Sequence, residues 1–579
     1  MHYGPTLPIS QEIHAMKYRD EGESFEDSQV RVARALADDM EHELRIRSIF
    51  LNQRFMAAGR VQSAMGRAIR VTPYNCFVSA TIEDSFDGIF EAFHRAGRTM
   101  RLGGGIGYDF TPIRPRGDLI ESLGSKASGP VSFMFIGDAT CKSVASAGHR
   151  RGAQMGVLMV WHPDIEEFIE AKSTPGVLTA FNVSVGITDE FMQAVIDGTP
   201  FALRWGGKVY RYIDARALWD KIMRLTWDWA EPGVLFMDTI NRMNNLYYCE
   251  KISATNPCAE QPLPPNGACL LGSFNLVKYL SRSLATGKLY FNYAMLSQDI
   301  PYVVRAMDNV VDRAIYPLPE QEAEAKSKRR MGLGVTALAN CAEALGYVYG
   351  SPEFLEFEDS VLSFLTNECY MASALLAAEK GSFPLFDKEK YLAGEFVKRL
   401  DPDVRKAIEK HGIRNSHLTS IAPTGTISLS ADNVSGGIEP VFSHFYDRTI
   451  QTFEGPKVER VTDYGYREFG VKGRTANECS VDDHLNALLV ATKWMDSAVS
   501  KTCNVGDHVT FEEFKDIYMK AWKGGAKGCT TFRAAGKRYG ILNEVKDEAP
   551  KVETTVETAV EEQPMACFID PATGKKTCE

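Results

Sequence analysis

Between about residue 70 and residue 542, short apolar runs alternate with amphipathic segments of helical spacing. The runs VLMVW at 157–161 and NVSVGI at 182–187 have the length and composition of buried strands, and a helix is expected through Glu190–Ile196. Strands that alternate with helices form parallel sheets in α/β proteins. The alternation therefore predicts an α/β architecture, although periodicity alone does not choose between an eight-stranded barrel and an open sheet.

Two flanking segments depart from this alternation. Residues 10–58 are expected to be helical, with Ser24 as a helix N-cap before apolar residues at helical spacing. Residues 543–564 are acidic and lack a periodic apolar face, which predicts a disordered tether. We divide the chain into an N-terminal helical region (1–70), a main domain (71–542) and a tether that ends in two cysteines (543–579).

The bulk composition excludes several classes of protein. A net charge of −10 argues against a sequence-independent nucleic-acid binder, and no apolar run approaches the length of a membrane span. The N-terminus lacks the apolar core of a signal peptide, so a cytoplasmic location is expected. Twelve cysteines in 579 residues are too sparse for a disulfide scaffold. No cysteine–histidine cluster has zinc spacing, and we expect no metal site.

One proline-rich loop concentrates reactive side chains. Asn256, Cys258 and Glu260 alternate along it, and on an extended segment alternate residues face the same side. Pro257 and Pro262 restrict the backbone. An amide, a thiol and a carboxylate would then face one polar substrate. Taken alone, the loop is equally typical of an ordinary proline-rich segment with a buried cysteine.

Four segments together resemble one enzyme family. The run NPCAEQPLPPNGACLLGSFNL, which begins at Asn256, resembles the finger loop of ribonucleotide reductase large subunits, most closely that of the adenosylcobalamin-dependent (class II) enzymes. TPYNCFVSATIEDSFDGI at 72–89, RRGAQMGVLMVWHPDIEEFIEAK at 150–172 and PTGTISLSADNVSGGIEPVF at 423–442 resemble further segments of the same family. The resemblance runs in order from about residue 8 to 542.

The resemblance implies a specific fold. Members of the family have a ten-stranded α/β barrel built from two five-stranded parallel halves, with the finger loop through its centre. We expect that architecture here. An additional N-terminal ATP-binding cone occurs in some members, and we expect none here, because about 70 residues precede the barrel.

The resemblance also implies catalytic roles. Cys258 would carry a thiyl radical, Glu260 would be the general base, and Asn256 would orient the ribose. Cys76 and Cys269 match the reducing pair that closes as a disulfide. Without the flanking motifs, two unrelated core cysteines would be favoured.

The 423–428 segment offers backbone N–H groups and hydroxyls in a short turn. A helix that starts there would present an anion site, although similar residues cap many helices without binding a ligand. By resemblance Thr424, Gly425, Thr426 and Ile427 line the substrate phosphates, with Ser428 adjacent. Glycine-rich residues 103–107 lack the dinucleotide fingerprint and are interpreted as a tight turn in the barrel wall.

A specificity site for deoxynucleotide or ATP effectors is implied by two other segments. One of these segments contains the adjacent arginines Arg150 and Arg151, which from composition alone would be interpreted as a solvated basic turn. Because this site lies at a subunit interface in the family, a homodimer is expected, with a monomer as the alternative. The matching residues are Asp84, Ser85, Phe86, Arg150, Arg151 and Gln154.

Cys567 and Cys578 follow the acidic tether. A frayed tail is the simplest interpretation. A flexible tether also raises the local concentration of its thiols near an active site. The resemblance implies a redox shuttle reduced by a thioredoxin-like partner, although the ten intervening residues exceed the usual close spacing.

The radical source distinguishes the classes of this family. Class I large subunits use two adjacent tyrosines near the end of the barrel, and the matching segment Gly528–Arg533 carries Phe532 and no tyrosine. This favours adenosylcobalamin as the cofactor. The resemblance implies ribonucleotides as the substrates, with diphosphates expected by family habit. The alternatives are a class I large subunit that needs a separate metal-containing partner, and a non-catalytic nucleotide-binding relative.

Overall fold

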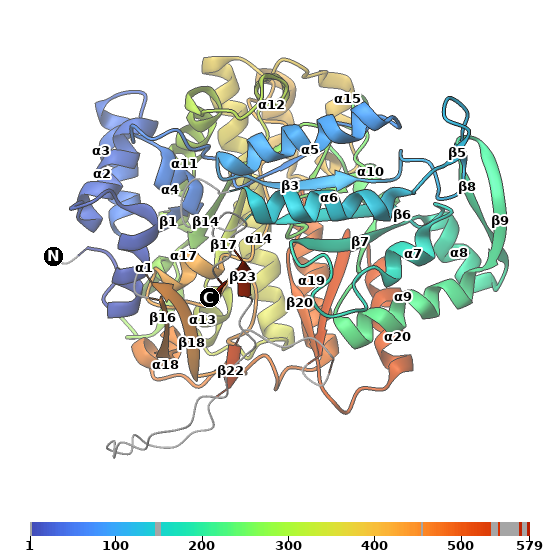
Figure 1. Cartoon of the computed structure of the whole chain (residues 1–579). Helices are drawn as coiled ribbons and strands as arrows, with labels where there is room; N and C mark the ends of the chain where they lie inside the picture. The colour runs from blue at the N-terminus through green and yellow to red at the C-terminus, as the bar shows by residue number, and fades with distance from the viewer. Residues whose placement is uncertain are drawn as a thin grey trace.

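The structure is a computed structural model that describes residues 3–144, 152–452, 455–533, 536, 542–544, 567–569 and 576–578 (Figure 1). For residues 448–452 and 455–457, and for the three segments beyond residue 541, it describes the backbone only.

Helices dominate the N-terminal region, as expected. They are α1 Pro8–Tyr18, α2 Phe25–Leu36 and α3 Met40–Leu51, drawn in dark blue in Figure 1. The Ser24 hydroxyl accepts a hydrogen bond from Asp27 N and completes a capping box, which confirms the predicted N-cap. The expected helical stretch is interrupted by strand β1 (Phe55–Ala57), which precedes the short helix α4 (Gly59–Ala64).

The first half of the main domain contains five parallel strands. They pair in the order β2 (Cys76–Val78), β3 (Gly105–Asp109), β6 (Gln154–Met159), β7 (Phe181–Ile187) and β10 (Gly233–Phe236). The connecting helices include α5 (Phe86–Arg101), α6 (Pro130–Ser143), α7 (Ile165–Glu170), α8 (Asp189–Asp197) and α9 (Ala215–Trp229). The strands predicted near 157–161 and 182–187, and the helix through residue 190, are confirmed.

The second half also contains parallel pairs. Strand β14 (Leu271–Asn275) pairs with β17 (Gly332–Thr336), and β20 (Thr502–Val505) pairs with β21 (Gly528–Arg533). Single parallel bridges, Leu333 with Thr419 and Ile421 with Val499, link these pairs. The halves meet where β21 runs antiparallel to β10 and where β13 (Ala268–Cys269) runs antiparallel to β2.

The α/β architecture is therefore confirmed. Among the described residues the strands form an eight-stranded sheet, β13-β2-β3-β6-β7-β10-β21-β20, and a three-stranded sheet, β1-β14-β17. A single closed barrel of ten strands stays a prediction.

Long helices cover the second half. They are α11 (Tyr293–Arg313), α14 (Pro352–Lys380), α16 (Pro402–His411), α19 (Val481–Trp494) and α20 (Phe511–Lys523). By length and composition alone α14 could cross a membrane, contrary to the sequence expectation. Its most apolar window is 67% buried, however, and the helix packs against α11, α16 and α19. It is a core helix of the domain.

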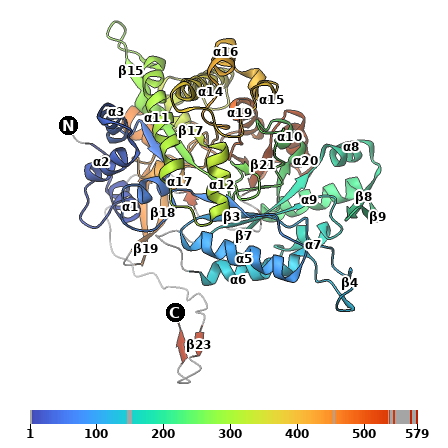
Figure 2. The same cartoon turned by 90° about the horizontal axis from the view of Figure 1, so that it is seen from above.

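The remaining elements are short. The helices are α10 (Met237–Arg242), α12 (Pro319–Lys328), α13 (Leu338–Ala344), α15 (Lys388–Leu392), α17 (Gly425–Leu429), α18 (Tyr464–Phe469) and the 3-10 turns Leu276–Tyr279 and Val397–Arg399. The paired strands are β4 (Leu119–Ile120) with β5 (Ser125–Lys126), β8 (Pro200–Trp205) with β9 (Lys208–Asp214), β11 (Ala254–Thr255) with β12 (Pro262–Leu263), and β15 (Leu280–Arg282) with β16 (Leu289–Phe291). Strand β18 (Phe445–Thr452) lies between β19 (Gly455–Thr462) and β22 (Leu542–Glu544), and β23 (Cys567–Ile569) pairs with β24 (Lys576–Cys578) apart from the main body (Figure 2).

Candidate active site

The loop that carries Cys258 is the tip of a hairpin. Strands β11 and β12 pair, Asn256 N donates to Gln261 O at 3.1 Å, and Ala259 N donates to Asn256 O at 3.0 Å. Ala259 has a φ of 65°, in the left-handed region. The expectation of an extended segment is therefore wrong, because the backbone turns sharply between the cysteine and the carboxylate.

Asn256 helps to build this turn. Its side chain is buried, and Oδ1 accepts a hydrogen bond from Gln261 N at 2.9 Å. Its Nδ2 is buried without a hydrogen-bond partner among the atoms that the structure describes. Buried polar groups usually have a hydrogen-bond partner, so this unpaired Nδ2 is a candidate donor to a bound ligand.

The hairpin is clamped between the two halves of the domain. On one side a Cβ at Gly107 would lie 1.9 Å from Thr255 O, so only glycine lets β3 approach this closely. On the other side Ser420 Oγ and Ala498 N donate to Glu260 O at 2.8 and 3.0 Å. Gly107 also bears on the tight turn expected at residues 103–107. Only residues 103 and 104 can belong to such a turn, because β3 begins at Gly105.

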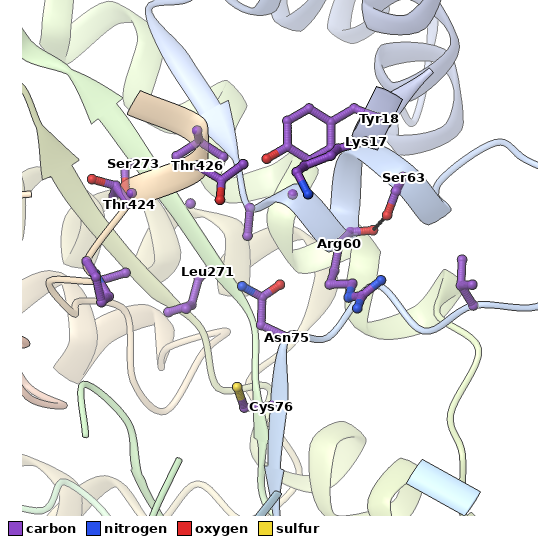
Figure 3. Close-up of a pocket in the computed structure, with 18 of the residues that line it drawn as sticks. Lys17, Tyr18, Arg60, Ser63, Asn75, Cys76, Leu271, Ser273, Thr424 and Thr426 are labelled. Carbon is purple, nitrogen blue, oxygen red and sulfur yellow. Dashed lines mark hydrogen bonds between the residues drawn. The ribbon is translucent and has the colours of Figure 1, made fainter. Parts of the chain in front are cut away.

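Cys258 and Glu260 line one cavity of about 520 Å³. Cys76, labelled in Figure 3, lines the same cavity. Cys258 is half-buried, whereas Glu260 and Cys76 are buried. Asn256 is not on the cavity wall. The structure therefore brings two of the three predicted loop residues to one space.

Cys269 lies beside Cys76 and is fully buried. The two cysteines are directly opposite each other in the antiparallel pairing of β13 with β2. Opposed residues of antiparallel strands have Cα atoms about 4.5–5.5 Å apart, within the range that a disulfide spans. A sequence separation of 193 residues is thus closed by the sheet.

The predicted phosphate turn forms another part of the cavity wall. Thr424, Gly425, Thr426 and Ile427 line it, and α17 starts at Gly425. Thr426 is exposed to the cavity, whereas the Thr424 and Ser428 hydroxyls bond to each other at 2.9 Å. Ser428 thus supports the turn from behind.

The predicted effector residues lie away from this cavity. Asp84 accepts hydrogen bonds from Arg114 N and Nε at 2.9 and 2.8 Å, and Ser85 caps α5. Phe86 is 70% exposed. The Gln154 side chain is buried, accepts a hydrogen bond from the Tyr108 hydroxyl and donates to Gly137 O. Positions 150 and 151, both arginine, lie outside the described residues.

The tail cysteines are opposed in a hairpin. Cys567 and Cys578 are register partners in the antiparallel pairing of β23 with β24. The ten intervening residues therefore do not keep the two backbone positions apart.

Sequence reasoning missed the cavity wall contributed by the N-terminal region. The end of α1, the helix α4 and the segment after it supply Lys17, Tyr18, Arg19, Arg60, Ser63 and Arg67. No motif marks these residues. Asn75 and Ser273 were also missed, although each neighbours a motif residue or lies within the finger-loop run. Across the described ranges, no group of three or more His, Cys, Asp or Glu side chains could hold a metal ion.

The family model for the barrel domain of ribonucleotide reductase matches residues 74–472 and 471–532, which include every residue of the predicted catalytic set. The chain belongs to the ribonucleotide reductase family. This assignment confirms the resemblance carried by the four sequence segments.

Three relatives extend the comparison. The chain is 36% identical over 82% of its length to a vitamin B12-dependent ribonucleoside-diphosphate reductase of Mycobacterium tuberculosis, and covers 69% of that protein. It is 35% identical over 83% of its length to one of the same name from Thermoplasma acidophilum, covering 63% of it. A vitamin B12-dependent ribonucleotide reductase of Streptomyces clavuligerus is 28% identical over 94% of this chain, which covers 65% of that relative. The chain thus spans about two thirds of the length of these relatives.

Proposed function

We propose that this chain reduces ribonucleoside diphosphates to 2′-deoxyribonucleotides. The observation that carries the proposal is a single cavity that joins the thiol of Cys258 and the carboxyl of Glu260 to the predicted phosphate turn, with Cys76 on the same wall. The diphosphate preference is taken from the names of the two relatives that are most similar in the comparison above.

The residues suit radical chemistry at the ribose. The thiyl form of Cys258 takes the hydrogen atom from C3′, and Glu260 accepts the proton of the 3′-hydroxyl. The 2′-hydroxyl leaves as water with a proton from the Cys76–Cys269 pair. That pair supplies two electrons and two protons in total and closes as a disulfide. The hydrogen atom then returns from Cys258 to C3′, so the thiyl form is regenerated.

Asn256 would position the ribose. Its Oδ1 is held by Gln261 N, which fixes the amide plane and leaves Nδ2 as the donor. Nδ2 is buried behind the cavity wall, so its hydrogen bond to a ribose hydroxyl would require the hairpin to shift when substrate binds, and that bond would compensate for the desolvation of the amide.

Adenosylcobalamin is the cofactor that we propose, as the relatives' names suggest. When bound, it supplies a carbon radical that can take a hydrogen atom from a thiol. Cys258 fits this requirement because it is half-buried, whereas Cys76 and Cys269 are at most 2% exposed. Phe532, in place of the expected class I tyrosine, cannot act as a phenol relay. The cavity has the size of a nucleotide site, so we assign it to the substrate and assign no side chain to the cobalamin.

Further features of the family are proposed with the activity. The two sheets would be halves of one ten-stranded barrel, which the bridges at Thr419 and Val499 and the antiparallel contacts of β21 and β13 support. The region of Asp84 and Phe86 would bind a deoxynucleotide or ATP effector at a homodimer interface. The hairpin that opposes Cys567 and Cys578 would carry electrons from a thioredoxin-like reductant.

The deciding experiment is an assay of deoxycytidine nucleotide formation. Purified chain is given CDP or CTP, dithiothreitol and dATP, with and without adenosylcobalamin, and Cys258→Ser is the control. We expect product from CDP only when adenosylcobalamin is present and none from the variant. Folded, nucleotide-binding protein that stays inactive with either substrate until a second subunit is added would contradict the proposal and favour a class I enzyme.

A further inference from the structure

Helix α1 is attached to the helix that begins at the phosphate turn. Ser10 Oγ donates to Leu429 O, the last residue of α17, at 2.6 Å. Just before α1, Thr6 N and Leu7 N donate to Asp432 Oδ1 at 2.7 and 2.9 Å. The start of α1 is therefore fixed at the C-terminal end of α17.

The other end of α1 reaches the cavity. Lys17 and Tyr18, in its last turn, line the same space as the first residues of α17. The two helices thus run in opposite directions along each other. A Cβ at Gly59 would lie 2.7 Å from the Tyr18 ring, so α4 packs closely against this end of α1 and places Arg60 beside it (Figure 3).

The cavity wall is strongly cationic. Its described lining contains four basic residues (Lys17, Arg19, Arg60 and Arg67) and a single carboxylate, Glu260. A space with this balance favours a ligand that carries several negative charges.

All four cations interact with other groups of the chain, and two of them pair with neighbouring side chains. Arg19 Nε donates to His14 Nδ1 at 2.9 Å, and Arg67 pairs with Asp20. Figure 3 shows the Lys17 amine extending into the space between Thr426 and Arg60, and the Arg60 side chain lines the same cavity. Arg60 is only 8% exposed, so its charge acts in a partly desolvated setting where it is strong.

We infer that Lys17 and Arg60 bind the terminal phosphate of a nucleoside diphosphate, beside the phosphate turn. This inference rests on the function proposed above. The turn around Thr426 offers backbone N–H groups to the phosphate nearest the ribose, and the N-terminal wall supplies full positive charges for the outer one. A guanidinium can contact two phosphate oxygens at once, whereas the lysine acts as a point charge.

The test compares binding of CMP and CDP by equilibrium dialysis, with dATP present to occupy any second nucleotide site. We expect the wild-type chain to bind CDP more tightly than CMP. In the double variant Lys17→Gln with Arg60→Gln, CDP affinity should fall roughly 10- to 100-fold, because hydrogen bonds to charged groups are lost. CMP affinity should change less than about threefold, which also shows that the variant is folded.

Arg34→Gln is the matched control, because Arg34 belongs to the same N-terminal region but its side chain is 71% exposed and lies outside the cavity. It should bind both nucleotides as the wild type does. In single-turnover assays the double variant should need more CDP but reach nearly the wild-type rate at saturation. An unchanged CDP preference in the double variant, or equal losses for CMP and CDP, would overturn the inference alone. A wild-type chain that binds neither nucleotide would overturn the proposed function as well.

Discussion

The two walls of the cavity differ in origin and in chemistry. One wall holds Cys258, Glu260 and Cys76, which come from the finger-loop hairpin and β2, and carries a thiol pair and one carboxyl. The other wall comes from α1, α4 and the residues that follow each of them, and it carries the cations. The first wall is suited to reaction at the ribose, and the second, together with the phosphate turn, to holding phosphate. The comparison indicates that chemistry and anchoring are supplied by separate parts of the chain and can be removed separately.

The strongest test of this separation is Cys258→Ser. A hydroxyl does not replace the thiol in hydrogen-atom transfer, so turnover should fall by at least about 1,000-fold. Binding of CDP, measured by equilibrium dialysis, should stay within about twofold, because the cationic wall is intact. A serine variant that loses CDP binding would show that the reacting wall also anchors the substrate.

Cys269→Ser tests the pair formed across β13 and β2. The variant keeps Cys76 on the cavity wall but removes its opposed thiol, so disulfide-forming turnover should stop. We expect a residual rate below about one hundredth of the wild type with dithiothreitol as reductant. Cys341→Ser is the control, since Cys341 is equally buried but lies in α13. Normal turnover in Cys269→Ser would refute the proposed disulfide.

Cys258, Glu260 and Cys269 could be predicted because the finger-loop motif places them close together in sequence, and Cys76 because its own segment at 72–89 resembles the family. The geometry of the finger loop could not be predicted. The expectation that alternate residues face the same side assumes an extended backbone, whereas Ala259 adopts a left-handed φ. The cationic wall gave no signal at all. Its position depends on contacts such as Ser10 with Leu429, which are 419 residues apart in the sequence. Strand and helix types followed from periodicity, whereas the closure between the two sheets depends on single bridges that no local pattern encodes.

The tail should act on neither wall directly. Cys567→Ser with Cys578→Ser should leave CDP binding and dithiothreitol-supported turnover near wild type, because the cavity residues are unchanged. With thioredoxin as the reductant, one turnover should occur and further turnover should fall at least about tenfold. A rapid-quench assay that measures the amount of product formed per enzyme distinguishes a single turnover from multiple turnovers. Sustained turnover of the double variant with thioredoxin would eliminate the shuttle.

A buried carboxyl outside the cavity provides a contrast with Glu260. Burial, with Asp463 nearby, raises the pKa of Glu343 to about 8. Between about pH 4.5 and 8 the unfolded chain releases this proton while the folded chain keeps it, so the free energy of unfolding should fall as pH rises. Glu343→Gln should remove that slope and be more stable than wild type at pH 8, by on the order of 2–4 kcal/mol.

Urea unfolding of both proteins at pH 5 and pH 8 measures this difference. CDP binding by Glu343→Gln should match the wild type, because Glu343 lies off the cavity wall. Equal pH slopes in the two proteins would show that Glu343 ionises normally in the folded chain.

The smallest expected effect concerns the attachment of α1. Ser10→Ala removes the hydrogen bond to Leu429 O, which contributes about 1 kcal/mol, and loosens the helix that carries Lys17. We expect CDP affinity to fall roughly two- to fivefold and the rate at saturation to stay within about twofold. Ser24→Ala is the control, since it removes the N-cap of α2 at a similar cost in stability without touching α17. If both variants weaken CDP binding equally, general loosening of the N-terminal region is the cause; a loss confined to Ser10→Ala would show that the contact between α1 and α17 holds the cationic wall in place.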